Sequence, residues 1–170
     1  MTNIFLIGFM GSGKTSVGKH LAELLKSEFV DLDEVLEKNE GKTISQIFAN
    51  RGEDLFRERE SQCLKSFAGK ANLVIATGGG TPCFHDNLKW MNENGVTIYL
   101  KTDPDILFYR LKGEISHRPL LANYSEEELK KFIESKLLER SSFYNSSKII
   151  LNTEEMNAKE IAEKIRAIAY

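Results

Sequence analysis

The sequence predicts one compact α/β domain built around a parallel β-sheet. Short apolar runs of strand length alternate along the chain with longer segments that place apolar residues at helical spacing, the pattern typical of a parallel α/β sheet. The length of 170 residues suits one domain with a sizeable core. No internal repeat or low-complexity linker divides the chain, so we expect a single domain over residues 1–170.

Five segments are candidate strands. Each is a short apolar run bounded by polar residues or glycine. They cover residues 4–7, 29–31, 73–76, 96–100 and 148–151. The first run leads into a glycine-rich segment and then into a helical pattern that carries Val17, Leu21 and Leu24, so a strand, a turn and a helix are expected in that order.

Four later helices carry start signals. Three combine a capping residue with Glu or Gln three positions later, and one combines a capping Asp with a proline in the first turn. The cap positions are Thr43, Asp103, Ser125 and Asn157. The longest stretch without a convincing pattern is 111–125, and loops of that size in compact domains are typically functional lids.

Composition and charge exclude several classes of function. The chain has 25 acidic and 23 basic residues, a net charge of −2, and no basic tract, so polymeric nucleic acid is not an expected partner. No apolar run approaches the roughly 20 residues needed to cross a bilayer, and no signal or transit peptide is recognised, so we expect a cytoplasmic, most simply bacterial, protein. Cys63 and Cys83 lack CxxC spacing, and we expect them to be reduced and without a chemical role.

The segment from Gly8 to Thr15, GFMGSGKT, matches the phosphate-binding pattern GxxxxGK[ST] in full. Backbone N–H groups in such a loop point at phosphate oxygens, at a helix N-terminus that already favours negative charge. Lys14 would reach the β and γ phosphates, and the Thr15 hydroxyl would ligate Mg²⁺. Binding of ATP or GTP is therefore predicted. The residues expected to contact the nucleotide are Gly11, Ser12, Gly13, Lys14, Thr15 and Ser16.

The P-loop alone does not separate a kinase from a GTPase or a motor. The N-K-x-D sequence that usually accompanies guanine specificity and a D-x-x-G switch sequence are both absent. A chain of 170 residues also leaves little room for the extra elements of an ATP-driven motor. Phosphoryl transfer to a small acceptor is the economical interpretation.

Two acidic residues follow the second predicted strand, at the edge where open α/β sheets bind their ligands. Asp31 and Asp33 are two positions apart, and in an extended segment their side chains would share a face. One carboxylate could then serve a hydrated Mg²⁺ and the other an acceptor hydroxyl. A solvated acidic turn is the alternative.

Two further features suit an acceptor site. Arg57 and Glu60 are three apart on a predicted helix and could pair, with the glutamate orienting the guanidinium, although such a pair alone is more often a surface salt bridge. Gly78, Gly79 and Gly80 follow the third strand, where they either let the backbone approach a ligand closely or form a plain flexible turn.

Taken together, these segments resemble the shikimate kinase family. The P-loop is followed by DLD at 31–33, FRERE at 56–60, GGG at 78–80, RPLL at 118–121 and RSSFY at 140–144, in the family's order and with similar spacings. The match extends from Gly8 to Tyr144. RPLL and GGG in a P-loop context are far more specific than the P-loop itself.

The resemblance implies a fold and an activity. The fold would be the three-layer α/β/α P-loop kinase fold of the nucleoside monophosphate kinases, with a five-stranded parallel sheet in the order 2-3-1-4-5. The activity would be transfer of the ATP γ-phosphoryl group to the 3-hydroxyl of shikimate, with Mg²⁺, in aromatic amino-acid biosynthesis. An acceptor-binding region at about 33–61, a lid at about 112–124 and a monomeric state are expected.

The resemblance also implies roles by position. Asp31 would act on Mg²⁺ through water, and Asp33 would bind the acceptor's ring hydroxyls and share the catalytic role with Lys14 and Arg118. Arg118 would come from the lid and meet the transferring phosphoryl group. Arg110 lies near the family's adenine-side arginine, but the loop before RPLL differs in length, so a solvated helix position is an open alternative.

The remaining implied roles concern the acceptor. Two arginines would clamp the shikimate carboxylate, a glutamate would support the first of them, three glycines would contact the substrate through their backbone, and two aromatic rings would wall the pocket. In that order these residues are Arg57, Arg140, Glu60, Gly78, Gly79, Gly80, Phe48 and Phe56.

Two alternatives stand beside this interpretation. Another small-molecule P-loop kinase, such as a gluconate kinase, would share the nucleotide half, but Arg57, Arg140 and the three glycines argue against it. A nucleotide-binding regulator with a degraded acceptor site is the alternative from a different class, and the presence of every residue expected for catalysis argues against that.

Overall fold

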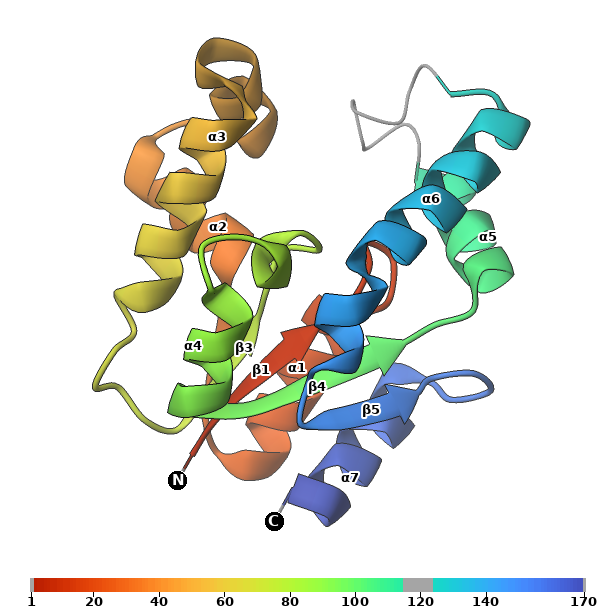
Figure 1. Ribbon diagram of the computed structural model, residues 1–170. Coiled ribbons are helices and arrows are strands. Elements are labelled where there is room, and N and C mark those ends of the chain that lie inside the picture. The colour runs from red at the N-terminus through yellow and green to blue at the C-terminus, as the bar shows by residue number, and fades with distance from the viewer. Residues whose placement is uncertain (1, 115–123, 170) are drawn as a thin grey trace.

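A five-stranded parallel sheet in the order β2-β3-β1-β4-β5 forms the centre of the computed structural model, which describes residues 2–114 and 124–169 (Figure 1). The strands are β1 Asn3–Ile7, β2 Glu28–Asp31, β3 Leu73–Ala76, β4 Gly95–Lys101 and β5 Ile149–Asn152. All five predicted strands and the order implied by the family resemblance are confirmed.

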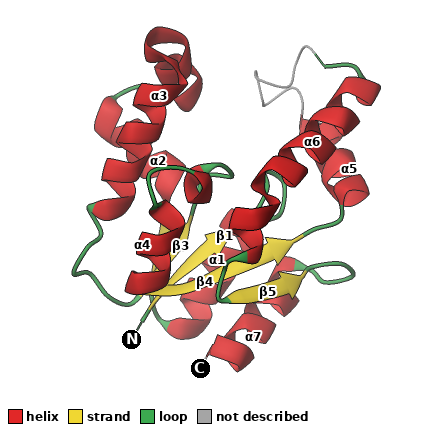
Figure 2. Cartoon of the chain, in the orientation of Figure 1, coloured by secondary structure: helices red, strands yellow, loops and turns green. Residues whose placement is uncertain are grey.

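Helices alternate with the strands (Figure 2). They are α1 Lys14–Leu25, α2 Leu32–Glu40, α3 Ile44–Lys65, α4 Asn87–Asn94, α5 Pro104–Glu114, α6 Glu126–Asn145 and α7 Ala158–Ala169, with a short 3₁₀ turn η1 at Thr81–Cys83. The four predicted caps are confirmed. Thr43, Ser125 and Asn157 each accept a backbone N–H three residues on and receive the reciprocal Glu or Gln contact, and Asp103 accepts from the N–H of Asp105.

Both faces of the sheet are covered by helices. Successive strand residues point to opposite faces, and in β1 all four of Ile4, Phe5, Leu6 and Ile7 are almost fully buried. Ile4 and Leu6 pack with α1 and α7, whereas Phe5 and Ile7 pack with α2, α3 and α4. The architecture is therefore the three-layer α/β/α arrangement that was expected.

A third apolar cluster attaches the P-loop to α5 and α6. Phe9 of the loop packs there with Leu107 and Leu111 from α5 and with Leu129 and Ile133 from α6. Figure 1 shows α2 and α3 rising from the sheet on one side and α5 and α6 on the other. The P-loop is thus packed directly onto the second pair of helices.

Three helical details differ from the sequence-based expectation. Neither α2 nor α4 was predicted, and α4 has no side-chain cap on its first N–H groups, so it lacks the usual start signal. The two patterns at 44–48 and 56–60 belong to one helix, α3, which kinks at Gly52 with φ 76°, a conformation that glycine adopts without strain. The predicted patternless stretch begins too early, because α5 continues to Glu114.

The lid expected at about 112–124 lies only partly within the described residues. Its first three residues belong to α5, and 115–123, which include Arg118, lie outside the described part of the chain. Among residues 2–114 and 124–169, none of the helices combines the length and the apolar character needed to cross a bilayer.

Candidate active site

The P-loop connects β1 to α1, and three of its glycines have positive φ angles. Gly8, Gly11 and Gly13 have φ angles of 147°, 81° and 88°, a region that side-chain-bearing residues rarely adopt. Gly13 is the N-cap of α1, so the loop ends where the N–H groups of the helix are unpaired. This arrangement is suited to an anionic ligand.

Side chains of the loop and of α5 surround its mouth. The Lys14 Nζ donates to the carbonyls of Gly8 and Phe9, both at 2.9 Å. Arg110 Nη1 donates to the carbonyl of Gly11 at 3.0 Å, so this exposed side chain contacts the loop. The Ser12 hydroxyl is buried without a hydrogen-bond partner among the described residues.

A cavity of about 440 Å³ lies above the loop. Its lining includes every residue predicted to contact the nucleotide within the P-loop, both acidic residues of the DLD segment, and two of the three glycines after β3. These residues are Gly11, Ser12, Gly13, Lys14, Thr15, Ser16, Asp31, Asp33, Gly78 and Gly79, with Arg110 and Glu114 from α5. The residues predicted to bind the nucleotide and some of those predicted to bind the acceptor therefore line the same cavity.

Asp31 connects the P-loop to the N-terminus of α2. Its Oδ2 accepts from the Thr15 hydroxyl at 2.8 Å, and its Oδ1 accepts from the Asp33 N–H at 3.1 Å. The predicted extended DLD segment is wrong, because Asp31 is the N-cap of α2 and Asp33 lies in the first turn. The cap favours helix over strand at this point, and both carboxylates still line the cavity.

Asp33 is a half-buried carboxyl group with an unusual titration. Its burial, with the nearby charges of Glu60 and Asp31, raises its pKa to about 6 against the opposing effect of Lys14. Burial disfavours the charged form, and neighbouring carboxylates do the same. The group therefore changes charge close to neutral pH, as a proton acceptor in catalysis does.

Arg57 and Glu60 form a buried ion pair on α3. Arg57 Nη1 donates to Glu60 Oε2 at 2.9 Å, and the two residues are 8% and 1% exposed. Glu53 accepts two longer contacts of 3.3 Å from the same guanidinium. The predicted pair is confirmed, and its burial excludes the alternative that it is a surface salt bridge.

Three aromatic rings surround the Arg57 guanidinium. Its central carbon lies 6.0, 4.9 and 4.4 Å from the ring centroids of Phe48, Phe56 and Phe84, within the range of cation–π attraction. Phe48 and Phe56 were predicted to line the acceptor pocket, whereas Phe84 was missed. No motif marks Phe84, which is one of several phenylalanines scattered through the chain.

The three glycines after β3 each face a functional side chain. A Cβ at Gly78 would lie 2.8 Å from Glu60 Oε1 and 3.1 Å from Asp33 Oδ1. At Gly79 it would lie 3.1 Å from Arg140 Nη1, and at Gly80 it would lie 2.5 Å from Arg57 Nη2. The backbone of the three glycines therefore lies close to charged side chains of the site, and any larger residue would displace them. That this backbone also approaches a ligand stays a prediction.

Arg140 reaches the same loop from α6. Its guanidinium lies over the Phe9 ring, 5.5 Å from the centroid, and one turn further along α6 the Tyr144 hydroxyl donates to the Gly79 carbonyl at 2.6 Å. Burial raises the pKa of Tyr144 well above its usual range, against the opposing charge of Arg140. Tyr144 therefore stays protonated and holds α6 to the glycine loop.

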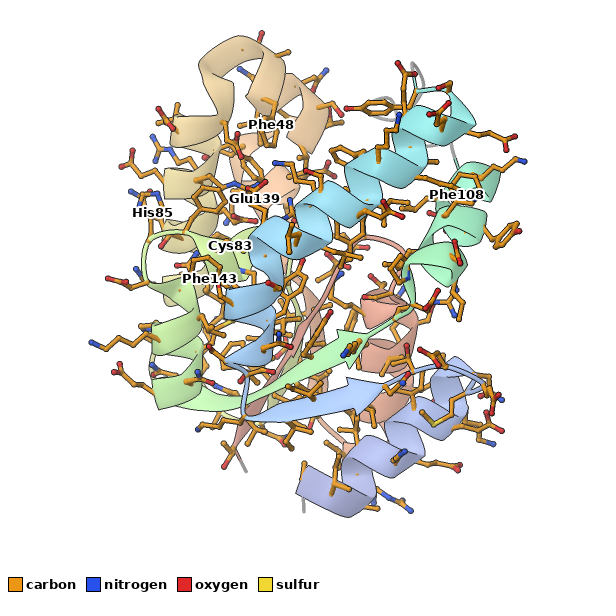
Figure 3. All side chains as sticks on the ribbon, turned by 45° about the vertical axis from the view of Figure 1, so that its right-hand side comes forward. Phe48, Cys83, His85, Phe108, Glu139 and Phe143 are labelled. Carbon is orange, nitrogen blue, oxygen red and sulfur yellow. The ribbon has the colours of Figure 1, made fainter. Side chains whose placement is uncertain are left out.

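Cys83 marks the place where the two arginines converge. Burial raises the pKa of its thiol to about 11, while Arg140 and Arg57 both lower it. Figure 3 labels Phe48 on α3, Cys83 on η1 and Glu139 on α6. Arg57 lies on the same helix as Phe48, and Arg140 lies on the same helix as Glu139. Cys63 and Cys83 are both unpaired, and burial raises the pKa of each thiol to about 11, so both thiols are protonated at neutral pH.

The arrangement suits phosphoryl transfer from a nucleotide to a small anionic acceptor. One side offers loop N–H groups and Lys14 to phosphates, and the other offers two guanidinium groups beside a carboxylate with a pKa of about 6. Within the described residues no three His, Cys, Asp or Glu side chains form a metal-binding cluster. The Thr15 and Asp31 oxygens, 2.8 Å apart, fit Mg²⁺, which takes few protein ligands beside waters and phosphates.

Comparison with known proteins identifies the family. A sequence model described as shikimate kinase matches residues 10–169. A shikimate kinase of Phocaeicola vulgatus is 46% identical over 159 residues, which cover 94% of this chain and 91% of the relative.

Two solved structures extend the comparison to the fold. The crystal structure of shikimate kinase from Bacteroides thetaiotaomicron has a TM-score of 0.91 and 40% identity, covering 98% of this chain and 96% of that one. Shikimate kinase from Acinetobacter baumannii in complex with shikimate has the same TM-score and 36% identity, covering 99% and 92%. With sequence and fold matched over almost their whole length, the chain belongs to the shikimate kinase family.

Proposed function

We propose that this chain transfers the γ-phosphoryl group of ATP to the 3-hydroxyl of shikimate, giving shikimate 3-phosphate and ADP in aromatic amino-acid biosynthesis. The observation that carries the proposal is the convergence of Arg57 and Arg140 on the Gly79–Gly80 backbone, beside a cavity that the P-loop lines. The solved Acinetobacter baumannii relative in complex with shikimate supports the acceptor. A neutral sugar acceptor would give two converging guanidinium groups no partner.

The acceptor carboxylate would lie between the two arginines. The planar fork of a guanidinium matches a carboxylate better than any other cation. The Arg57 pair with Glu60 uses Nη1 and fixes the plane of the fork. Phe48 and Phe56 would form the apolar wall, and the backbone of Gly78 to Gly80 would contact the ring, since no side chain intervenes there.

Asp33 would act on the acceptor hydroxyl. As a carboxylate it accepts hydrogen bonds from ring hydroxyls, positions the attacking oxygen and takes its proton. Because phosphoryl transfer needs positioning and cations more than covalent chemistry, Lys14 would stabilise the charge on the β and γ phosphates. Arg118, which lies outside the described residues, would add a second cation from the lid.

The P-loop would hold the phosphates through its N–H groups, with contributions from Gly11 to Ser16. Mg²⁺, when bound, would screen the β and γ phosphate charges. Thr15 would be its direct protein ligand, and Asp31 would accept from a metal-bound water. Arg110 already contacts the loop carbonyl of Gly11, so we assign it to the nucleotide side of the site.

The assignment divides one domain, residues 1–170, into an acceptor-binding region at about 33–61 and a lid at about 112–124. The enzyme is proposed to act as a cytoplasmic monomer with small-molecule substrates. The net charge of −2 supports the proposal that nucleic acid is not a partner, and the described helices give no reason to expect a membrane.

The first test measures ADP release with shikimate, with gluconate and without an acceptor. We expect shikimate to stimulate release strongly and gluconate not to do so. Replacing either Arg57 or Arg140 by Ala should raise the KM for shikimate, corresponding to about 2–4 kcal/mol of lost binding, because the anion loses a charged partner in a closed site. The KM for ATP should hardly change.

Arg59→Ala is the matched control for this test. Arg59 lies on the same helix, is half exposed and pairs with Glu40 at 3.7 Å, so its loss should leave the KM for shikimate unchanged. Equal ADP release with gluconate, or a normal KM for shikimate in both clamp variants, would remove the basis of the proposal.

A second prediction separates Asp31 from Asp33. Asp31→Asn keeps an oxygen that can cap α2 but loses charge at the metal site, so the Mg²⁺ requirement should rise about 10-fold and excess Mg²⁺ should restore part of the rate. Asp33→Asn should stay impaired at every Mg²⁺ concentration. The measurement is initial rate against free Mg²⁺ for both variants, and rescue of Asp33→Asn alone would mean that the two roles are exchanged.

A third prediction uses the titration of Asp33. Its pKa of about 6 means that the carboxylate is present above that pH and is lost as pH falls, so kcat/KM for shikimate should decline below about pH 6. Glu37 is one of the charges that raise this pKa, so Glu37→Gln should move the decline to lower pH. A profile that is flat to pH 5, or a shift in the opposite direction, would exclude Asp33 as the titrating group.

A further inference from the structure

The η1 turn that follows the three glycines is bonded to the ion pair on α3. The Thr81 hydroxyl donates to Glu60 Oε1 at 2.6 Å, and both residues are almost completely buried, at 0% and 1% exposure. A hydroxyl that donates to a buried carboxylate makes one of the stronger neutral-to-charged hydrogen bonds. This contact is not part of any sequence motif identified above.

Glu60 divides its two oxygens between two partners. Oε1 accepts from Thr81 and Oε2 accepts from Arg57 Nη1. Because Oε1 is held by Thr81, the orientation of the carboxylate is fixed, and it contacts Arg57 through Oε2. Without Thr81, Oε1 would be a buried acceptor that lacks this partner, and the carboxylate would gain by turning to accept from Arg57 with both oxygens.

The Arg57 guanidinium has little room to follow such a rotation of the Glu60 carboxylate. Its Nη2 lies 2.5 Å from the place where a Cβ on Gly80 would be, so the guanidinium is packed against the glycine backbone. Phe84, which directly follows the turn, covers one face of the guanidinium, whose central carbon lies 4.4 Å from the ring centroid. The turn and the residue after it therefore constrain Arg57 in two ways. Thr81 holds Glu60, which contacts the edge of the guanidinium, and the Phe84 ring covers its face.

Thr81 is itself fixed by hydrogen bonds to its main chain. Its N–H donates to the Gly78 carbonyl at 3.2 Å, and its carbonyl accepts from Asn87 Nδ2 at 2.9 Å. Asn87 Oδ1 in turn accepts from the Ser61 hydroxyl at 2.7 Å, and Asn87 and Ser61 are buried. Because Ser61 follows Glu60 on α3, the network closes on the helix that carries the ion pair.

We propose that Thr81 is a positioning residue for substrate recognition: its hydroxyl holds Glu60, and Glu60 presents the Arg57 guanidinium to the substrate carboxylate at a fixed angle. The inference rests on the proposed function, since it needs Arg57 to bind that carboxylate. Thr81 touches neither the reacting atoms nor the nucleotide side of the cavity lining. Its loss should therefore affect shikimate and leave ATP unaffected.

The experiment compares Thr81→Val and Thr81→Ser with the wild-type enzyme. Val replaces the hydroxyl by a methyl group of similar size, so the KM for shikimate should rise about 10-fold, a range typical of losing one hydrogen bond to a charged group, while the KM for ATP changes less than about 2-fold. Ser keeps the hydroxyl and should restore most of the affinity. If Thr81→Val does not fold, Thr81→Ala removes the hydroxyl with a smaller side chain and gives the same comparison.

Thr97→Val is the control for loss of a buried hydroxyl. Thr97 is also 0% exposed, and its hydroxyl donates to Asn92 Oδ1 at the same 2.6 Å, but it lies on β4 away from the proposed acceptor site. It should reduce stability without raising the KM for shikimate. An equal rise in KM with Thr97→Val, or an equal rise for ATP with Thr81→Val, would reduce Thr81 to a general structural role.

A double-mutant cycle with Arg57→Ala connects the effect to Arg57. If Thr81 acts through Arg57, Thr81→Val should change the KM for shikimate less than about 2-fold in the Arg57→Ala background. An undiminished 10-fold effect there would overturn the inference. If Arg57→Ala raises the KM but Thr81→Val does not, only the inference fails. If Arg57→Ala itself leaves the KM unchanged, the proposed clamp is wrong, and the inference fails with it.

Discussion

The buried carboxylate of Glu60 is the group around which the acceptor half of the site is organised. A charge at 1% exposure is tolerated only with partners, and breaking a buried pair costs about 3–5 kcal/mol because one charge is left uncompensated. Glu60 meets this requirement with Arg57 on its own helix and Thr81 on the η1 turn. The remaining nitrogens of Arg57, Nε and Nη2, make the longer 3.3 Å contacts with Glu53, whose side chain is more than half exposed. The pair that satisfies the buried Glu60 therefore also holds the Arg57 guanidinium beside the glycine loop.

The loop after β3 joins the two halves of the site. Its Thr77 hydroxyl and N–H both donate to the carbonyl of Leu6 in β1, the strand that leads into the P-loop, while the Gly79 carbonyl accepts from Tyr144 of α6. The loop therefore has a fixed position between the phosphate-binding side and the arginines. Glycine is needed there because the charged side chains from α3 and α6 lie within about 3 Å of the positions that Cβ atoms would take.

Much of the fold, and the segments that line the candidate site, could be predicted from the sequence for physical reasons. Strand runs, helix caps and the P-loop depend on residues close in the chain, and these predictions are confirmed. The extended DLD segment is wrong because one local contact, the capping of the Asp33 N–H by Asp31, begins a helix there. Contacts between distant segments leave no local pattern, so the burial of the Arg57–Glu60 pair and the contacts that Thr81 and Phe84 make with it required the structure.

In the proposed function, Arg57 with its buried partner Glu60 and the half-buried Arg140 together select the carboxylate of the acceptor. Isothermal titration of the wild-type enzyme with shikimate and with its uncharged carboxamide tests this claim without any substitution in the protein. The two ligands share the ring and its hydroxyls and differ only at the group that Arg57 and Arg140 are proposed to hold. We expect the amide to bind at least about 100-fold more weakly, since it offers the two cations no charge. Equal dissociation constants for the two ligands would mean that the two arginines do not recognise the carboxylate.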